Sequence, residues 1–193
     1  MTVDEIFSTI ATHMLEGIMI HEQLMETYLF LGLKGYAACH EYHYLAESKE
    51  RNFFLSNTIE HFGRLVETDI KRSQTRNLIP KSWYESTREM VDFQTRREAI
   101  AAGFDKWIDW EEETKELYSK SYKELLSLDE IQSAELIKGM CLDVEEELVY
   151  AKNERLAKAS MSFDMVSIIE EQSAVEQTFK KKLKKELSVS YEF

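Results

Sequence analysis

Apolar residues recur at helical spacing along most of the chain. In the first segment, Leu15, Ile18, Met25 and Leu29 follow one another at intervals of three, seven and four residues, which is the period of an α-helix with one buried face. The chain has a single proline, Pro80, and six glycines, whereas a sheet protein of this length needs many more turn residues. We therefore predict an all-α protein.

Turn signals divide this pattern into five helical segments. Two close glycines end the first segment, a proline-containing loop at 75–81 follows the second, and capping-box spacings open the third and the fourth. The predicted helices are Asp4–Leu33, Tyr36–Arg72, Ser82–Leu126 with a break near Gly103, Ser127–Ala159, and a last helix that Ser162 caps.

The lengths of the links predict how these helices pair. The link between the first and second helices and the link between the third and fourth helices are both short. Each of these two pairs should therefore form an antiparallel hairpin. The link between the hairpins is long enough to cross the bundle. With 193 residues, the chain fits one domain. We predict an antiparallel four-helix bundle with an additional C-terminal helix, as a single domain over residues 1–193.

Composition narrows the function classes. The formal net charge of −12 argues against nucleic acid and anionic membranes as partners, because both need a basic surface. No apolar run approaches the ~20 residues of a membrane span, and the acidic start has no secretory signal. Cys39 and Cys141 form no CxxC motif and fit small core residues in a reducing compartment. We expect a cytoplasmic protein.

Acidic residues fall on the predicted buried faces. Glu22 lies within the apolar stripe of the first helix, and His43, Glu47 and Glu50 share one face of the second helix at spacings i, i+4 and i+7. A buried carboxylate costs several kcal/mol unless it is paired or binds a metal. These acids therefore need a structural or functional explanation.

The acids also match in height within each hairpin. Glu22 lies twelve residues before the first turn and Glu47 thirteen after it, so at ~1.5 Å per residue they reach the same level. Glu111 lies sixteen residues before the second turn, with Asp143 sixteen and Glu147 twenty after it. Four helices can thus offer carboxylates, which are ligands for iron and manganese.

Two segments resemble the ferritin-like superfamily of carboxylate-bridged metal proteins. Residues 35–51 look like the second helix of that family and residues 110–117 like the third. The resemblance implies an iron or manganese site with oxidase or storage chemistry. Its implied ligands are Glu22 on the first helix, Glu47 and Glu50 at the ExxH positions of the second, Glu111 on the third, and Glu147 or Asp143 on the fourth.

The chain also departs from the family pattern. Glu50 stands where the family has histidine, and the fourth helix has no ExxH. His43 lies one turn before Glu47, and we count it among the candidate metal ligands. A mononuclear site, a degenerate site and no metal at all remain alternatives. A second, weaker resemblance, carried by residues 79–84, is to uncharacterised helical proteins of Gram-positive bacteria and their prophages; it implies no activity.

Three further interpretations stay open at this stage. The acids could form a structural network with Arg51, Arg64 or Lys115, in which case no metal is needed. The chain could be a non-enzymatic helical scaffold with an exposed apolar patch on the third or the last helix, and we expect a homo-oligomer. Glu47 and His43 could serve as acid and base of an enzyme, which would require a cleft at their level.

Overall fold

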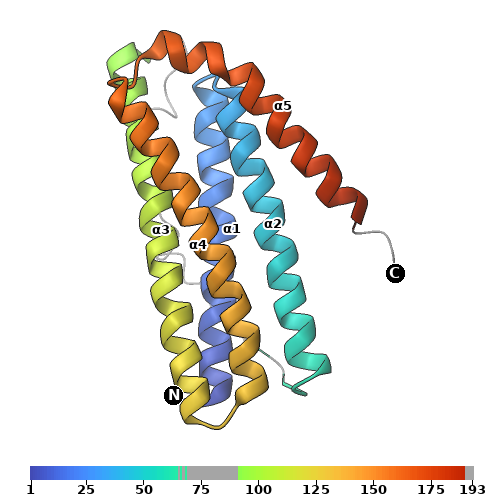
Figure 1. Ribbon diagram of the computed structural model, residues 1–193. Coiled ribbons are helices and arrows are strands. Elements are labelled where there is room, and N and C mark those ends of the chain that lie inside the picture. Colours follow the sequence, from blue (N-terminus) through green and yellow to red (C-terminus); the bar gives the residue numbers. More distant parts are fainter. Residues whose placement is uncertain (65, 67, 69–90, 190–193) are drawn as a thin grey trace.

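Five helices make up the computed structural model, which describes residues 1–64, 66, 68 and 91–189. They are α1 (Val3–Phe30), α2 (Lys34–Glu60), α3 (Phe93–Ser127), α4 (Ile131–Ser160) and α5 (Met165–Val189) (Figure 1). No strand occurs in the described ranges. The all-α prediction is therefore confirmed.

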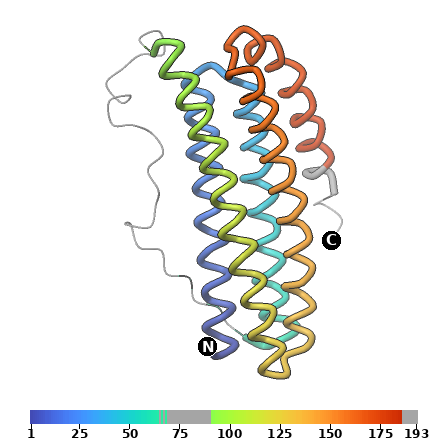
Figure 2. Tube along the Cα trace, turned by 60° about the vertical axis from the view of Figure 1, so that its left-hand side comes forward, coloured from blue at the N-terminus to red at the C-terminus, as the bar shows by residue number. Residues whose placement is uncertain are grey.

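The first four helices lie side by side as an elongated helical bundle (Figures 1 and 2). Short turns join α1 to α2 and α3 to α4, and each of these pairs packs along its length. Helices α2 and α3 run in the same direction, so the chain between them has to connect opposite ends of the bundle (Figure 1). Helix α5 packs against α2.

Local capping interactions fix where several helices begin. Thr2 and Glu5 form a capping box at α1, with bonds of 3.2 and 2.7 Å. The Asp92 side chain accepts a 2.7 Å hydrogen bond from the backbone N–H of Thr95 at α3. Helix α2 has no cap from its own side chains. Instead, Oε1 of Gln172 on α5 accepts hydrogen bonds from the backbone N–H groups of Gly35 and Tyr36 at the start of α2. These bonds connect α5 to the first hairpin.

Several boundary predictions differ from the structure. Ser127 is the last residue of α3, and α4 begins at Ile131 without a side-chain cap, so the predicted capping box there is wrong. Asp164 rather than Ser162 caps α5, because its side chain accepts a hydrogen bond from the backbone N–H of Ser167. Helix α2 ends at Glu60 rather than Arg72. Helix α3 runs unbroken through Gly103, because this glycine makes room for a neighbour rather than for a turn: a Cβ there would lie 2.2 Å from the hydroxyl oxygen of Tyr28. The predicted loop at 75–81 and the capping box at 82–85 lie outside the described residues.

The core consists of two separate apolar clusters stacked along the bundle. One lies around Phe7, Phe54, Leu125 and Ile137, and the other extends from Leu24 through Trp107 to α5. Between the two clusters, the buried positions include Gly17 and His21 on α1, His40 and His43 on α2, and Glu111 and Thr114 on α3. A polar layer therefore crosses the middle of the bundle.

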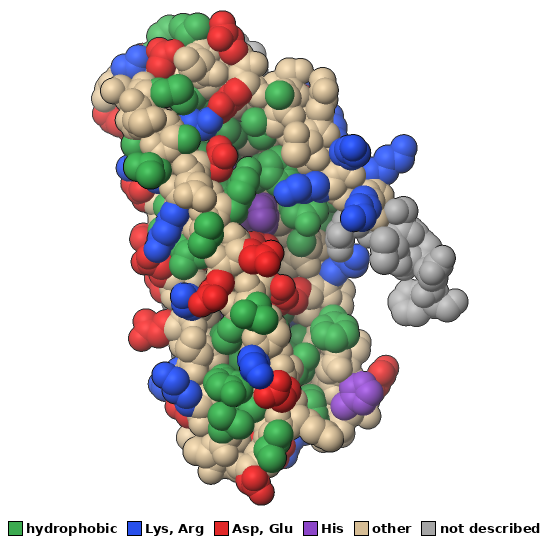
Figure 3. Space-filling model, viewed as in Figure 1, with side chains coloured by type: hydrophobic (Ala, Val, Ile, Leu, Met, Phe, Trp, Pro, Cys, Tyr) green, Lys and Arg blue, Asp and Glu red, His purple; other side chains and the backbone are tan. Residues whose placement is uncertain are grey.

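The outer surface carries both charged and apolar side chains. Figure 3 shows acidic side chains gathered midway along the face on which α4 lies, with a histidine visible just above them. This is the height of the polar layer. Among the described helices, none is both long and apolar enough to cross a membrane.

Candidate metal centre

The polar layer brings together side chains from all four bundle helices. His21 comes from α1, Glu47 from α2, Glu111 from α3 and Glu147 from α4. His21 is 0% exposed and Glu111 2% exposed, and the side chain of Glu47 is 14% exposed. Three ionisable groups are therefore held deep between the apolar clusters, where charge is costly unless it is compensated.

Three of these residues present ligand atoms to one another. One nitrogen of His21 and one carboxylate oxygen each of Glu47 and Glu111 lie within 4.8 Å of one another. The Nε2 atom of His21 lies 3.3 Å from Oε1 of Glu47. Ligand atoms on opposite sides of one transition-metal ion are about 4 Å apart, so small side-chain adjustments would close this group around an ion.

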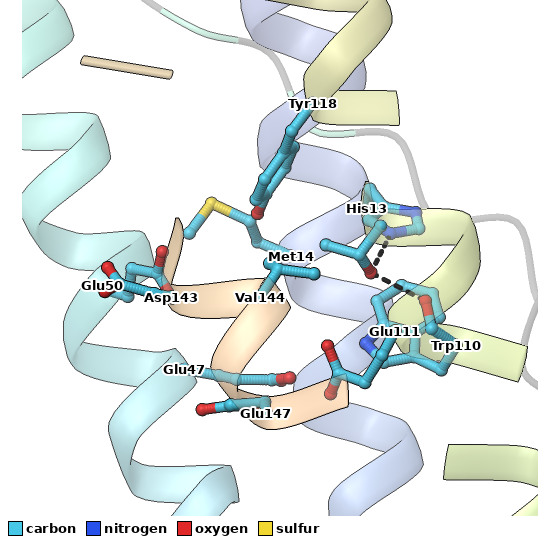
Figure 4. A pocket seen from close by; sticks show the side chains of 11 residues that line it. His13, Met14, Glu47, Glu50, Trp110, Glu111, Tyr118, Asp143, Val144 and Glu147 are labelled. Carbon is cyan, nitrogen blue, oxygen red and sulfur yellow. Dashed lines mark hydrogen bonds between the residues drawn. The ribbon is translucent and has the colours of Figure 1, made fainter. Parts of the chain in front are cut away.

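A small cavity adjoins Glu47 and Glu111, whereas His21 is not among the residues that line it. Its volume is about 30 Å³, enough for one or two atoms of the size of water. Figure 4 shows the carboxyl groups of Glu47, Glu111 and Glu147 converging in it, whereas Glu50 and Asp143 lie to one side. The remaining lining side chains are His13, Met14, Trp110, Thr114, Tyr118 and Val144.

Buried polar atoms without a hydrogen-bond partner concentrate here. Among the described residues, eight such side-chain atoms occur, and five belong to this layer. They are Nε2 of His21, both ring nitrogens of His43, Oε2 of Glu47 and Oε1 of Glu50. Most buried polar groups in folded proteins are hydrogen-bonded, and an unpaired one costs about 1–3 kcal/mol, so this layer is an energetically costly part of the described bundle.

The basic residues that a purely structural network would use form their contacts elsewhere. Arg51 donates to the carbonyl of Ala11 and to Thr68. Arg64 pairs with acids near the bundle end, and Lys115 pairs with Glu145 on the surface. The described contacts therefore give no support to the network that pairs these three cations with the buried acids.

Crowding of the acids changes their proton affinity. Burial, with the charges of Glu147, Glu47 and Asp143, raises the pKa of Glu50 to about 8. Burial and the charges of Glu147 and Glu47 also raise the pKa of Glu111 well above its usual range. These carboxyl groups therefore hold their protons more tightly than a free glutamate does, and a metal ion bound there would compete with those protons.

His43 lies next to an acid of α4. Its Nδ1 atom lies 3.4 Å from Oε2 of Glu147. Burial alone would lower the pKa of His43, but Glu147 and Cys39 together hold that pKa well above the usual range. Burial would likewise raise the pKa of Glu147, but the charge of His43 lowers it. The two form an ion pair beside the three-residue group.

The other predicted ligands lie at different distances from the three-residue group. Glu47 and Glu111 lie in the buried group, and Glu50 and Glu147 line the cavity. Asp143 lines the cavity as well but is exposed, so it sits at the rim.

The prediction that Glu22 faces the core is wrong, because Glu22 is exposed. The buried face of α1 is rotated by about one residue, or ~100°. The predicted height along the hairpin was accurate to one residue, because His21, which precedes Glu22 in the sequence, contacts Glu47.

A sequence signal for His21 did exist. Buried positions on α1 follow one another at alternating spacings of three and four, and the series is Phe7, Ile10, Met14, Gly17, His21, Leu24 and Tyr28. Counting only apolar residues hides this series, because a glycine and a histidine interrupt it. At Gly17 a Cβ would lie 2.7 Å from Oε2 of Glu47, so the glycine leaves space for that carboxylate.

Two other residues of the site were not predicted. Nε1 of Trp107 donates a 3.0 Å hydrogen bond to Oε1 of Glu111 and so fixes that carboxyl group. His40 is only 2% exposed and contacts His21. Neither position stands out in the helical pattern, because aromatic rings are ordinary core residues.

Comparison with known proteins adds no assignment. No protein-family model matches the chain, and neither curated proteins nor solved structures give a significant match.

Proposed function

We propose that this protein binds iron or manganese in the middle of its bundle, with His21, Glu47 and Glu111 as ligands. The observation that carries the proposal is the convergence of ligand atoms from three different helices, on buried His21 and Glu111 and half-buried Glu47. Two carboxylates and one imidazole suit these metals, which bind both oxygen and nitrogen. Glu147, Glu50 and the rim residue Asp143 could supply further oxygens.

The helix arrangement supports a ferritin-like origin for such a site. Two hairpins joined by a long link, with α2 and α3 running in the same direction, agree with that topology (Figure 1). The ligand set differs, because α1 contributes His21 instead of a glutamate and α4 has no histidine at this level. We therefore propose a modified ferritin-like site that holds one ion at its buried position.

The chemistry of this site follows from its shape. Three protein ligands leave open positions on an octahedral ion, and the adjoining cavity of about 30 Å³ can hold water or a small molecule such as dioxygen. An iron or manganese ion there would supply redox or storage chemistry. Trp107 would hold Glu111 in place, and Gly17 would let α1 approach the carboxylates.

Replacement of single carboxylates tests this proposal. We expect Glu47→Gln and Glu111→Gln each to weaken Mn(II) binding at least tenfold, because each removes an anionic ligand. Metal-free stability should change little or rise, since a neutral amide relieves crowded charge. Glu22→Gln is the matched control: this acid is exposed one residue from His21 and should leave binding unchanged. Titration calorimetry measures the affinities.

Metal content provides the direct check. Protein purified without chelator should contain a substantial fraction of an equivalent of iron or manganese. Less than a tenth of an equivalent of any transition metal, together with no rise in melting temperature on adding Fe(II) or Mn(II), would refute the proposal.

An exposed apolar row favours a scaffold role as a second candidate. Leu142, Val149 and Leu156 are 60, 58 and 68% exposed and lie seven residues apart on α4. They share one face of the helix, as in a helix–helix interface. The sequence predicted such a patch on the third or the last helix rather than on α4.

An acid–base enzyme that uses Glu47 and His43 is not favoured, because the cavity beside Glu47 is too small for an organic substrate.

A further inference from the structure

A hydrogen bond between two buried histidines lies directly behind the proposed ligand His21. The Nδ1 atoms of His21 and His40 are 2.8 Å apart, and the two residues are 0 and 2% exposed. One of these nitrogens carries the hydrogen and the other accepts it. The bond therefore has two proton arrangements.

The two arrangements differ in what Nε2 of His21 can do. With the hydrogen on Nδ1 of His21, Nε2 carries a lone pair and can bind a metal. With the hydrogen on Nδ1 of His40, a neutral His21 carries its hydrogen on Nε2, which cannot then be a ligand. Nε2 is the atom that lies 3.3 Å from Glu47.

We infer that His40 is a positioning residue, which accepts the Nδ1–H of His21 and so turns the lone pair of Nε2 toward the metal. The inference rests on the proposed metal centre. Histidine ligands in proteins almost always donate their second N–H to a fixed acceptor, which sets the tautomer and the ring orientation. Here that acceptor would be a neutral imidazole.

The surroundings of His40 suit this role. Its ring stacks on Tyr28 with a centroid separation of 5.4 Å, and Trp107 packs edge-on at 5.0 Å. His40 is 2% exposed among these rings, and such an apolar environment favours the uncharged form of an imidazole, which can accept a hydrogen bond. The acceptor is thus rigid as well as uncharged.

Two variants separate the hydrogen bond from packing. His40→Asn retains an acceptor oxygen near the position of Nδ1, whereas His40→Leu fills the space without an acceptor. His61→Leu removes an exposed histidine of the same helical hairpin and is the control. Zn(II) serves as a diamagnetic probe, and its affinity is measured by competition with a chromophoric chelator.

We expect His40→Leu to weaken Zn(II) binding 10- to 100-fold, as other losses of such a partner do, and His40→Asn and the control to stay within about threefold of wild type. In ¹⁵N NMR of the Zn(II) protein, the hydrogen should reside on Nδ1 of His21, with a coupling across the bond to His40. Equal affinity of His40→Leu and wild type would overturn the inference, as would equal losses in both His40 variants.

Failure of the metal centre itself would give a different result. If the wild-type protein binds neither Zn(II) nor Mn(II), the proposed function fails. The metal-free NMR spectrum then decides the inference separately: a hydrogen on Nδ1 of His21 upholds the acceptor role of His40, and a hydrogen on Nδ1 of His40 overturns it.

Discussion

Glu50 and Glu111 are carboxyl groups held where ionisation is unfavourable. The pKa of Glu50 is raised to about 8, and that of Glu111 lies well above its usual range. Unfolded glutamate has a pKa of about 4.3. Between about pH 4.5 and 8 the folded protein therefore binds more protons than the unfolded chain, and stability must fall as the pH rises.

This linkage predicts the pH dependence of the metal-free protein. With chelator present, the free energy of unfolding should be larger at pH 6 than at pH 8, with a slope of up to about 1.4 kcal/mol per pH unit for each such group. The raised pKa of His43 acts in the same direction above pH 6.5. Urea unfolding at several pH values measures the slope.

Glu50→Gln should flatten that slope, because the amide stays neutral throughout. Excess Mn(II) should reduce or invert it, since the metal competes with protons for the same oxygens. Equal unfolding free energies at pH 6 and pH 8 without metal would contradict this account.

At the scale of whole helices, glycines decide how closely α1 and α3 approach. Gly103 of α3 faces the hydroxyl of Tyr28, which is 1% exposed and stacked on His40, so the ring has little freedom to move. Gly139 of α4 has no neighbouring atom within 4 Å of a built Cβ. The same residue type thus has opposite structural roles on neighbouring helices.

We predict opposite effects for the two alanine substitutions. Gly103→Ala should lower the free energy of unfolding by about 1–3 kcal/mol through overpacking against Tyr28. Gly139→Ala should raise it by about 0.5–1 kcal/mol through helix propensity alone. Chemical denaturation of both variants measures the effects, and stabilisation by Gly103→Ala would show that the helices are not in close contact there.

For the whole molecule, the exposed row on α4 predicts self-association. Leu142, Val149 and Leu156 form one line, and a two-fold symmetric pairing would bury the row of each copy against the other. We expect a mass above one chain in light scattering at micromolar concentrations, which Val149→Glu should return to that of a monomer. Val166→Glu, which changes an equally exposed residue of α5, is the control. A monomeric wild type would refute this prediction.

The sequence by itself determined the helices, the hairpins and the height of the acids. These features depend on local periodicity, on turn residues and on the fixed rise per residue, which is why Glu47 and Glu111 were placed at the level where they are found. The loose agreement with the ferritin-like pattern came from the same local spacings.

Only the tertiary structure decided which side chains meet. A rotation of ~100° about the α1 axis exchanges Glu22 for His21, and this rotation is set by the packing of all helices together rather than by α1 alone. The partnership of His21 with His40 and the pairing of His43 with Glu147 depend on the same packing. The acids were therefore predictable as a layer, whereas the residues that meet in the proposed metal centre were not.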